Sequence, residues 1–241
     1  MVVPLYDDNP FTLPVRPVVT WALIAANILV YVLEISTGTG DTQDAANIYG
    51  LLPAAFSGDA VDNPDALAPV FTLVTYMFLH ADAGHLFGNM IFLWVFGDDL
   101  EEVLGRGRFL AFYLMCGIAG ALLFIWSDPH AQVTLIGASG AISGVVVAYV
   151  MLRPCAKVTV LVTIIPLRIR AYWVVGAFIL LQFISLGSAS KSEVAYWCHV
   201  GGMIAGAVLF LVMRPPGVML FECMQAPPSV PPDRSRTGPW G

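Results

Sequence analysis

The sequence predicts an all-α membrane protein of six transmembrane helices, and three observations support this fold class. Hydrophobic residues make up 58% of the 241-residue chain and charged residues only 12%, whereas soluble domains carry about 25% charged residues. Several uncharged runs approach the ~20 residues that cross a hydrocarbon core of ~30 Å. The Lys and Arg residues also fall almost entirely on one side of the resulting arrangement.

Six apolar runs are the expected spanning helices. The second run is the shortest, and it extends to about Leu104 if its charged end reaches the membrane interface. A further run, Leu67–Leu79, is too short to span and is interpreted as an interfacial segment. In chain order, the six runs are Val18–Leu33, Leu86–Phe96, Phe109–Trp126, Val133–Leu152, Ala171–Gly187 and Val194–Met213.

The positive charges orient this bundle with both termini in the cytoplasm, because Lys and Arg near helix ends are retained on that side. Only Lys191 then lies outside. A long outer loop 1, about residues 36–83, has acidic but no basic residues and is expected to be partly embedded in the outer interface. The cytoplasmic basic residues are Arg16, Arg106, Arg108, Arg153, Lys157, Arg168, Arg170, Arg214, Arg234 and Arg236.

Three regions follow from these assignments. Residues 1–17 form a cytoplasmic N-terminal segment, residues 18–213 form the membrane domain, and residues 214–241 form a Pro-rich, disordered cytoplasmic tail. The spacing of the four cysteines suggests neither a metal site nor a disulfide framework, so no disulfide is expected. The net charge of −6 comes largely from outer loop 1 and does not indicate a nucleic-acid partner.

Four polar residues are predicted to lie at one depth in the membrane. The second, fourth and sixth helices all run inward from the outside, and Ser139 and His199 lie five or six residues into two of them. His85 and Asn89 lie within the first two turns of the second helix. A rise of 1.5 Å per residue therefore places all four about 10 Å below the outer surface, as expected for a single site.

Glycines provide a way for two of these helices to meet. His199, Gly202 and Gly206 form one stripe of the sixth helix, where another backbone can approach closely. The fourth helix carries Gly140 and Gly144 and is the expected neighbour, in a central position.

Close packing of these two helices predicts nucleophilic chemistry. It brings the Ser139 hydroxyl within reach of the His199 imidazole, as a base that activates a weak nucleophile requires. His85 and Asn89, four residues apart, both donate hydrogen bonds and can stabilise an oxyanion together with the Ser139 N–H. A single serine in a membrane helix usually hydrogen-bonds to the backbone of its own helix, and a single asparagine usually hydrogen-bonds between helices. The prediction therefore depends on all of these residues together.

These motifs closely resemble those of the rhomboid family of intramembrane serine proteases, over nearly the whole chain. The stretch Gly97–Gly105, with Glu101, also resembles the segment that closes the family's second helix. The three matching motifs are Gly-x-Ser-Gly at Gly137–Gly140, the histidine with glycines three and seven residues later at His199, Gly202 and Gly206, and His-x4-His-x3-Asn at His80, His85 and Asn89.

The resemblance implies a serine endopeptidase that needs no cofactor or metal and cleaves the transmembrane or juxtamembrane segments of single-pass proteins through an acyl-enzyme. It implies a Ser139/His199 dyad with no acidic third member, an oxyanion hole of Asn89, His85 and backbone donors, and a supporting hydrogen bond from His80. The lipid bilayer and transmembrane substrates are the expected partners. The short N-terminal segment favours a bacterial inner membrane, with the site opening to the periplasm.

Two positions depart from the family pattern. Many members have Trp-Arg in the first loop where this chain has Phe71 and Thr72, which bears on how that loop is anchored. Some members stack an aromatic residue on the catalytic histidine where this chain has Ser143. The imidazole is then either held less firmly or hydrogen-bonded by Ser143.

The sequence disfavours several other classes of membrane protein. No His-Glu-x-x-His motif and no second buried Asp are present, which excludes metalloprotease and aspartyl-protease chemistry. The main alternative is a non-catalytic rhomboid-like protein that binds client transmembrane helices, although such proteins normally lack the serine or the histidine. A six-helix transporter or channel is disfavoured, since the sequence has no internal repeat and no paired broken helices.

Overall fold

The computed structural model describes residues 2–8, 16–37, 42–60, 63–162, 164–187, 196–221 and 223. Each predicted apolar run forms a helix, in most cases longer or shorter than its run by a few residues. Three helices are long and apolar enough to cross a membrane among the residues described, namely α1, α6 and α9. The six helices are α1 (Val18–Thr37), α5 (Ala83–Leu104), α6 (Arg106–Ser127), α7 (Ser139–Leu152), α8 (Ala171–Gly187) and α9 (Tyr196–Met213).

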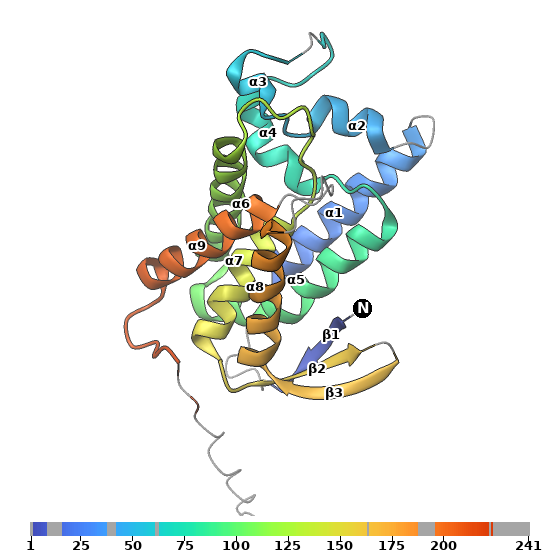
Figure 1. Cartoon of the computed structure of the whole chain (residues 1–241). Helices are drawn as coiled ribbons and strands as arrows, with labels where there is room; N and C mark the ends of the chain where they lie inside the picture. Colours follow the sequence, from blue (N-terminus) through green and yellow to red (C-terminus); the bar gives the residue numbers. More distant parts are fainter. Residues whose placement is uncertain are drawn as a thin grey trace, which may run out of the picture.

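Helix α7 lies at the centre of the bundle, with α5, α6, α8 and α9 around it (Figure 1). Most of its residues are buried, and its apolar composition leaves no polar face for solvent. The central position predicted from its glycines is therefore confirmed. Because α7 begins at Ser139, the serine lies at the end of the bundle that faces outer loop 1.

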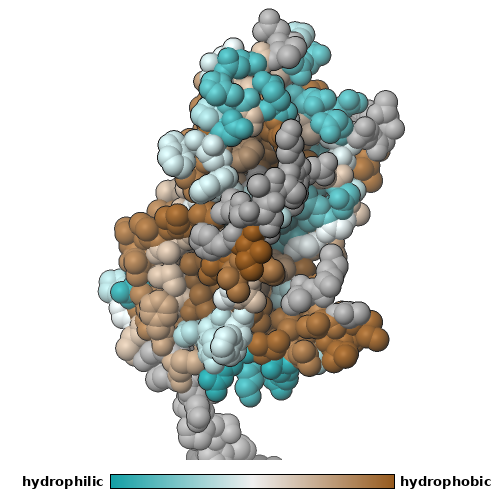
Figure 2. Space-filling model, viewed as in Figure 1, coloured by the Kyte–Doolittle hydropathy of each residue, from teal (hydrophilic) through white to brown (hydrophobic). Residues whose placement is uncertain are grey.

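The described residues of outer loop 1, 42–60 and 63–83, include four short helices on that end of the bundle. Tyr76 anchors it, because its hydroxyl donates a hydrogen bond of 2.8 Å to the Gly117 carbonyl on α6. Figure 2 shows a hydrophilic surface over this end of the molecule and a mainly hydrophobic surface over the middle. The short helices are α2 (Thr42–Tyr49), α3 (Ala54–Ser57), α4 (Pro69–Thr75) and the 3-10 helix η1 (Tyr76–Phe78).

Glu101 joins α5 to the start of α1. Its carboxylate is fully buried and accepts hydrogen bonds from the Val19 N–H at 2.9 Å and the Thr20 N–H at 2.7 Å. The Thr20 hydroxyl donates a third bond at 2.9 Å. A helix leaves its first N–H groups without intrahelical partners, so this carboxylate caps α1 from a neighbouring helix.

A three-stranded sheet lies across the opposite end of the bundle, and the all-α prediction missed it (Figure 1). The strands β1 (Val2–Asp7), β2 (Lys157–Val162) and β3 (Ile165–Arg170) pair antiparallel in that order. The run from 157 to 170 is rich in β-branched residues, which favour strands. The N-terminal segment supplies the third strand, a long-range pairing that no local pattern indicates.

The chain also stays ordered past the predicted start of the tail. The Phe221 N–H donates to the Met151 carbonyl at 2.8 Å, so residues 214–221 turn back towards the end of α7. This return brings Cys223 to Cys155, and the two form a disulfide. The prediction of no disulfide was therefore wrong. The two cysteines meet because the chain turns back after α9, and their spacing in the sequence does not indicate this. The remainder of the predicted tail lies outside the described residues.

Candidate active site

The segment before Ser139 is held in an extended form by outer loop 1. Leu135 pairs with Leu51 through two backbone hydrogen bonds, of 2.8 and 3.1 Å. The Gly137 N–H then donates to the Tyr76 carbonyl at 2.9 Å. Since these bonds end two residues before α7 begins, they fix where Ser139 enters the site.

Gly137 needs to be glycine for two reasons. Its φ is +115°, a backbone conformation that other L-residues rarely adopt. A Cβ atom at this position would also lie 2.7 Å from Nε2 and Cε1 of the His85 ring. His85 therefore packs directly against the backbone of the turn that leads to Ser139.

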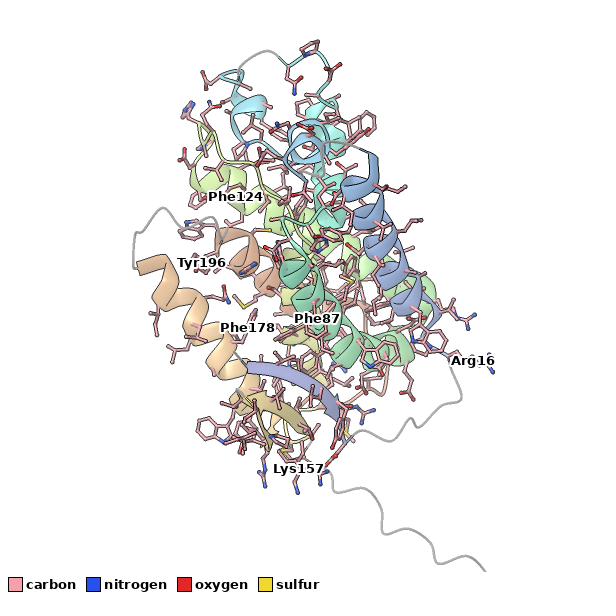
Figure 3. All side chains as sticks on the ribbon, turned by 90° about the vertical axis from the view of Figure 1, so that its right-hand side faces the viewer. Arg16, Phe87, Phe124, Lys157, Phe178 and Tyr196 are labelled. Carbon is pink, nitrogen blue, oxygen red and sulfur yellow. A yellow bond between two sulfur atoms is a disulfide. The ribbon has the colours of Figure 1, made fainter. Side chains whose placement is uncertain are left out.

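The Ser139 hydroxyl and the His199 imidazole are in hydrogen-bonding contact, with 2.8 Å between Oγ and Nε2. His199 lies in the first turn of α9 and is buried, whereas Ser139 is half-buried. The Tyr196 ring approaches the imidazole edge-on, with 6.2 Å between ring centroids. Figure 3 labels Tyr196 at the start of α9, beside α8.

The close packing of α7 on α9 that brings these two residues together depends on glycines. A Cβ atom on Gly202 would lie 1.9 Å from the Gly140 carbonyl oxygen, and one on Gly206 would lie 2.4 Å from the Gly144 Cα. Any side chain at Gly202 or Gly206 would therefore force the two backbones apart. The predicted pairing of these glycine stripes is the pairing that the structure has.

Asn89, His80 and His85 form a second cluster, and two of its members, His85 and Asn89, lie beside Gly137, two residues before the serine. The Asn89 amide nitrogen is 3.0 Å from His80 Nε2, and the His80 and His85 rings meet edge to face with centroids 5.1 Å apart. His80 precedes α5, and burial, with a smaller effect of nearby His85, lowers its pKa to about 4. A neutral His80 can accept from the Asn89 amide, which carries a second N–H towards Gly137.

The start of α5 is fixed by a side-chain cap. The Asp82 carboxylate accepts a hydrogen bond of 2.8 Å from the His85 N–H, as helix-capping residues do. This cap begins α5 at the residues that place His85 and Asn89 one turn apart on the face towards Gly137.

Gln182 is the site residue that the sequence analysis missed. Its amide oxygen lies 2.7 Å from His199 Nδ1, and its side chain is buried on α8. Ser143, by contrast, donates its hydroxyl hydrogen to the Ser139 carbonyl at 2.7 Å, so it does not hold the imidazole. The signal available in the sequence was a lone amide within the apolar run Ala171–Gly187.

The arrangement brings together a hydroxyl, an imidazole within hydrogen-bonding distance, and several N–H donors near the same turn. Helix N-termini add to these donors, since the first N–H groups of α7 have no acceptor within the helix. Within the described parts of the chain, no three His, Cys, Asp or Glu side chains form a group suited to a metal ion.

Comparison with known proteins identifies relatives across most of this chain. A family model described as the Rhomboid domain matches residues 68–216. Rhomboid protein 1, mitochondrial, of Saccharomyces cerevisiae is 31% identical over 150 residues, 60% of this chain and 42% of that protein. Rhomboid protease GluP of Bacillus subtilis is 29% identical over 193 residues, 79% of this chain and 34% of that protein.

Rhomboid protease AarA of Providencia stuartii is 26% identical over 230 residues, which is 84% of this chain and 77% of that protein. The chain therefore spans less than half the length of the yeast and Bacillus relatives and most of the Providencia relative. The matches also include a Drosophila melanogaster protein named as inactive.

Proposed function

Because the chain belongs to the rhomboid family of multi-pass membrane proteins, we propose that it is an intramembrane serine endopeptidase acting through Ser139 and His199. The observation that carries the proposal is the 2.8 Å contact between Ser139 Oγ and His199 Nε2 inside a largely apolar bundle. Ionisable residues are costly in such surroundings and are commonly functional. An imidazole at hydrogen-bond distance is the base that a serine nucleophile requires.

The reaction begins with proton transfer from the Ser139 hydroxyl to His199 Nε2 as Oγ attacks the substrate carbonyl. The imidazolium then returns the proton to the leaving amine, which leaves an ester on Ser139. Water, deprotonated by the same imidazole, hydrolyses this ester and releases the second product. His199 Nε2 transfers the proton in both acylation and deacylation, so the same packing of α7 on α9 positions the imidazole for both.

The tetrahedral intermediate needs hydrogen-bond donors for its oxyanion. Asn89 Nδ2 and His85 Nε2 lie 3.6 and 2.7 Å from the point where a Gly137 Cβ would be, two residues before the nucleophile. With the Ser139 N–H at the start of α7, they form the proposed oxyanion hole. His80 supports Asn89 through their 3.0 Å contact.

We further propose that the substrate is the transmembrane or juxtamembrane segment of a single-pass protein. A helical peptide bond buries its carbonyl in the hydrogen-bond ladder, so such a segment must unwind before Ser139 can attack it. Substrates with Gly or Pro near the cleaved bond unwind more easily, because both residues disfavour helix.

The proposed topology has six spans, cytoplasmic termini and a site that opens to the outer, periplasmic side of a bacterial inner membrane. In this topology residues 18–213 are the protease domain, and residues 1–17 and 214–241 are cytoplasmic. Arg16 and Lys157 lie towards one end of the bundle and Phe124 towards the other (Figure 3), which agrees with retention of basic residues on the cytoplasmic side.

The alternative function is client binding without catalysis. The Ser139–His199 contact favours the protease, because a protein that only binds helices has no need for a base hydrogen-bonded to a serine. The deciding experiment reconstitutes the protein in proteoliposomes with a single-pass reporter substrate and follows the product by mass spectrometry. Cleavage by the wild type and none by Ser139→Ala is expected. Binding of the reporter without cleavage by the wild type supports the alternative instead.

A further inference from the structure

We infer that Gln182 is a positioning residue that fixes the tautomer and orientation of the His199 imidazole, in the place that an acidic residue takes in catalytic triads. The inference rests on the proposed protease function and adds a third member to the Ser139/His199 pair. The 2.7 Å contact between Gln182 Oε1 and His199 Nδ1 carries it.

The direction of the two hydrogen bonds on the imidazole follows from the acceptor on α8. An amide oxygen has lone pairs but no hydrogen, so it can only accept. Nδ1 must therefore carry the hydrogen of a neutral imidazole, which leaves the lone pair on Nε2. The Ser139 hydroxyl, 2.8 Å from Nε2, then donates its hydrogen to that lone pair. This is the tautomer in which His199 can act as a base.

The alternative tautomer would block the reaction. If Nδ1 lacked its hydrogen, Nε2 would carry it and would point an N–H at the serine, with no lone pair to receive the serine proton. In the apolar interior of the bundle, water does not readily supply an alternative acceptor for Nδ1. A fixed acceptor on a neighbouring helix therefore selects the productive form before substrate binds.

No other described side chain does this for the imidazole. Ser143 donates to the Ser139 carbonyl, and Tyr196 presents its ring edge at 6.2 Å between centroids. The edge contact restricts ring tilt but accepts no proton. Gln182, a residue that is only 7% exposed, is thus the group that holds Nδ1.

The position of Gln182 also links α8 to the chemistry. Ser139 and His199 belong to α7 and α9, which pack through glycines, whereas Gln182 reaches the imidazole from α8. Leu180 and Leu181, beside it, are exposed on the outer face of α8. The orientation of the imidazole is therefore tied to α8 through Gln182 as well as to α7 through Ser139.

Two substitutions test this assignment. Gln182→Met keeps the length of the side chain but has no oxygen, whereas Gln182→Glu keeps an oxygen that can accept the Nδ1 hydrogen. The Met variant is expected to lower kcat about 10- to 100-fold with KM nearly unchanged, since a buried N–H loses its acceptor. The Glu variant is expected to stay within about threefold of wild type. Leu181→Met, on the exposed face of the same helix, is the control.

The measurements are substrate turnover and the rate of labelling by a fluorophosphonate probe at saturating concentration, with melting temperature in detergent to verify folding. Wild-type rates in a folded Gln182→Met variant overturn the inference, and so does equal loss of activity in the Met and Glu variants. A wild type that is never labelled, although folded, contradicts the proposed protease function itself and removes the basis of the inference.

Discussion

Replacing Gly202 by Ala tests whether catalysis depends on the contact between α7 and α9. The new Cβ would lie 1.9 Å from the Gly140 carbonyl oxygen and 2.8 Å from its carbonyl carbon. Both neighbours are backbone atoms, so no side-chain rotation can relieve the clash. An ordinary contact begins near 3.4 Å, and the helices must therefore part by about 1.5 Å.

This separation acts directly on the dyad, because His199 lies three residues before Gly202 and Ser139 lies next to Gly140. A displacement of that size moves Oγ and Nε2 from 2.8 Å beyond hydrogen-bonding range. A misplacement of about 1 Å in an active site costs about 100-fold in rate. We therefore expect Gly202→Ala to lower kcat by about 100-fold or more.

The assay is cleavage of a single-pass reporter in proteoliposomes, with the melting temperature measured in parallel. Gly176→Ala on α8 is the matched control, since a Cβ there meets nothing within 4 Å and should leave activity unchanged. Cleavage of the reporter by folded Gly202→Ala protein at close to the wild-type rate would show that catalysis does not depend on this contact.

Three further predictions concern separate parts of the molecule. Asn89→Ala removes an oxyanion donor, so it is expected to lower kcat about 10²- to 10³-fold with little change in KM. Steady-state kinetics measure both constants, and an unchanged kcat would contradict this role of Asn89. Glu101→Gln is expected to destabilise the fold by about 2–4 kcal/mol, because it removes the charge that accepts three buried hydrogen bonds from α1. Thermal melting measures this loss of stability, and Thr20→Val, which removes only one of the three bonds, is expected to lose less. A wild-type melting temperature for Glu101→Gln would contradict the prediction. The Cys155–Cys223 disulfide predicts that denatured, unreduced protein reacts with two maleimides, rising to four after reduction. Mass spectrometry counts the maleimide adducts, and four adducts before reduction would show that the disulfide is absent.

The helices could be predicted from the sequence because a helix buried in a membrane requires a continuous apolar run, which is a local feature of the sequence. A spanning helix needs a long uncharged run, and each of the six runs contains a helix. The largest differences are α7, which begins at Ser139 and not at Val133, and α5, which continues past Phe96 to Leu104. The approach of α7 to α9 could also be predicted, since a backbone contact requires residues without side chains at Gly202 and Gly206.

The features missed by the sequence analysis depend on contacts between distant segments. The β1 strand pairs with β2 across more than 150 residues, and nothing in either strand specifies the other. Cys223 reaches Cys155 only because the chain turns back after α9. Gln182 resembles an ordinary packing amide within an apolar helix until the structure places its oxygen on His199 Nδ1. In each case the deciding contact joins residues far apart in the sequence, and the local pattern does not identify the partner.

The central claim is that Ser139 is a nucleophile activated by His199, and site-specific labelling tests it most directly. Detergent-purified wild-type protein, Ser139→Ala and His199→Ala are each treated with a fluorophosphonate probe, and the modified peptide is located by mass spectrometry. A single adduct on Ser139 is expected in the wild type, and none is expected in either variant. Folded wild-type protein without an adduct, or labelling that persists at Ser139 in His199→Ala at the wild-type rate, would contradict it.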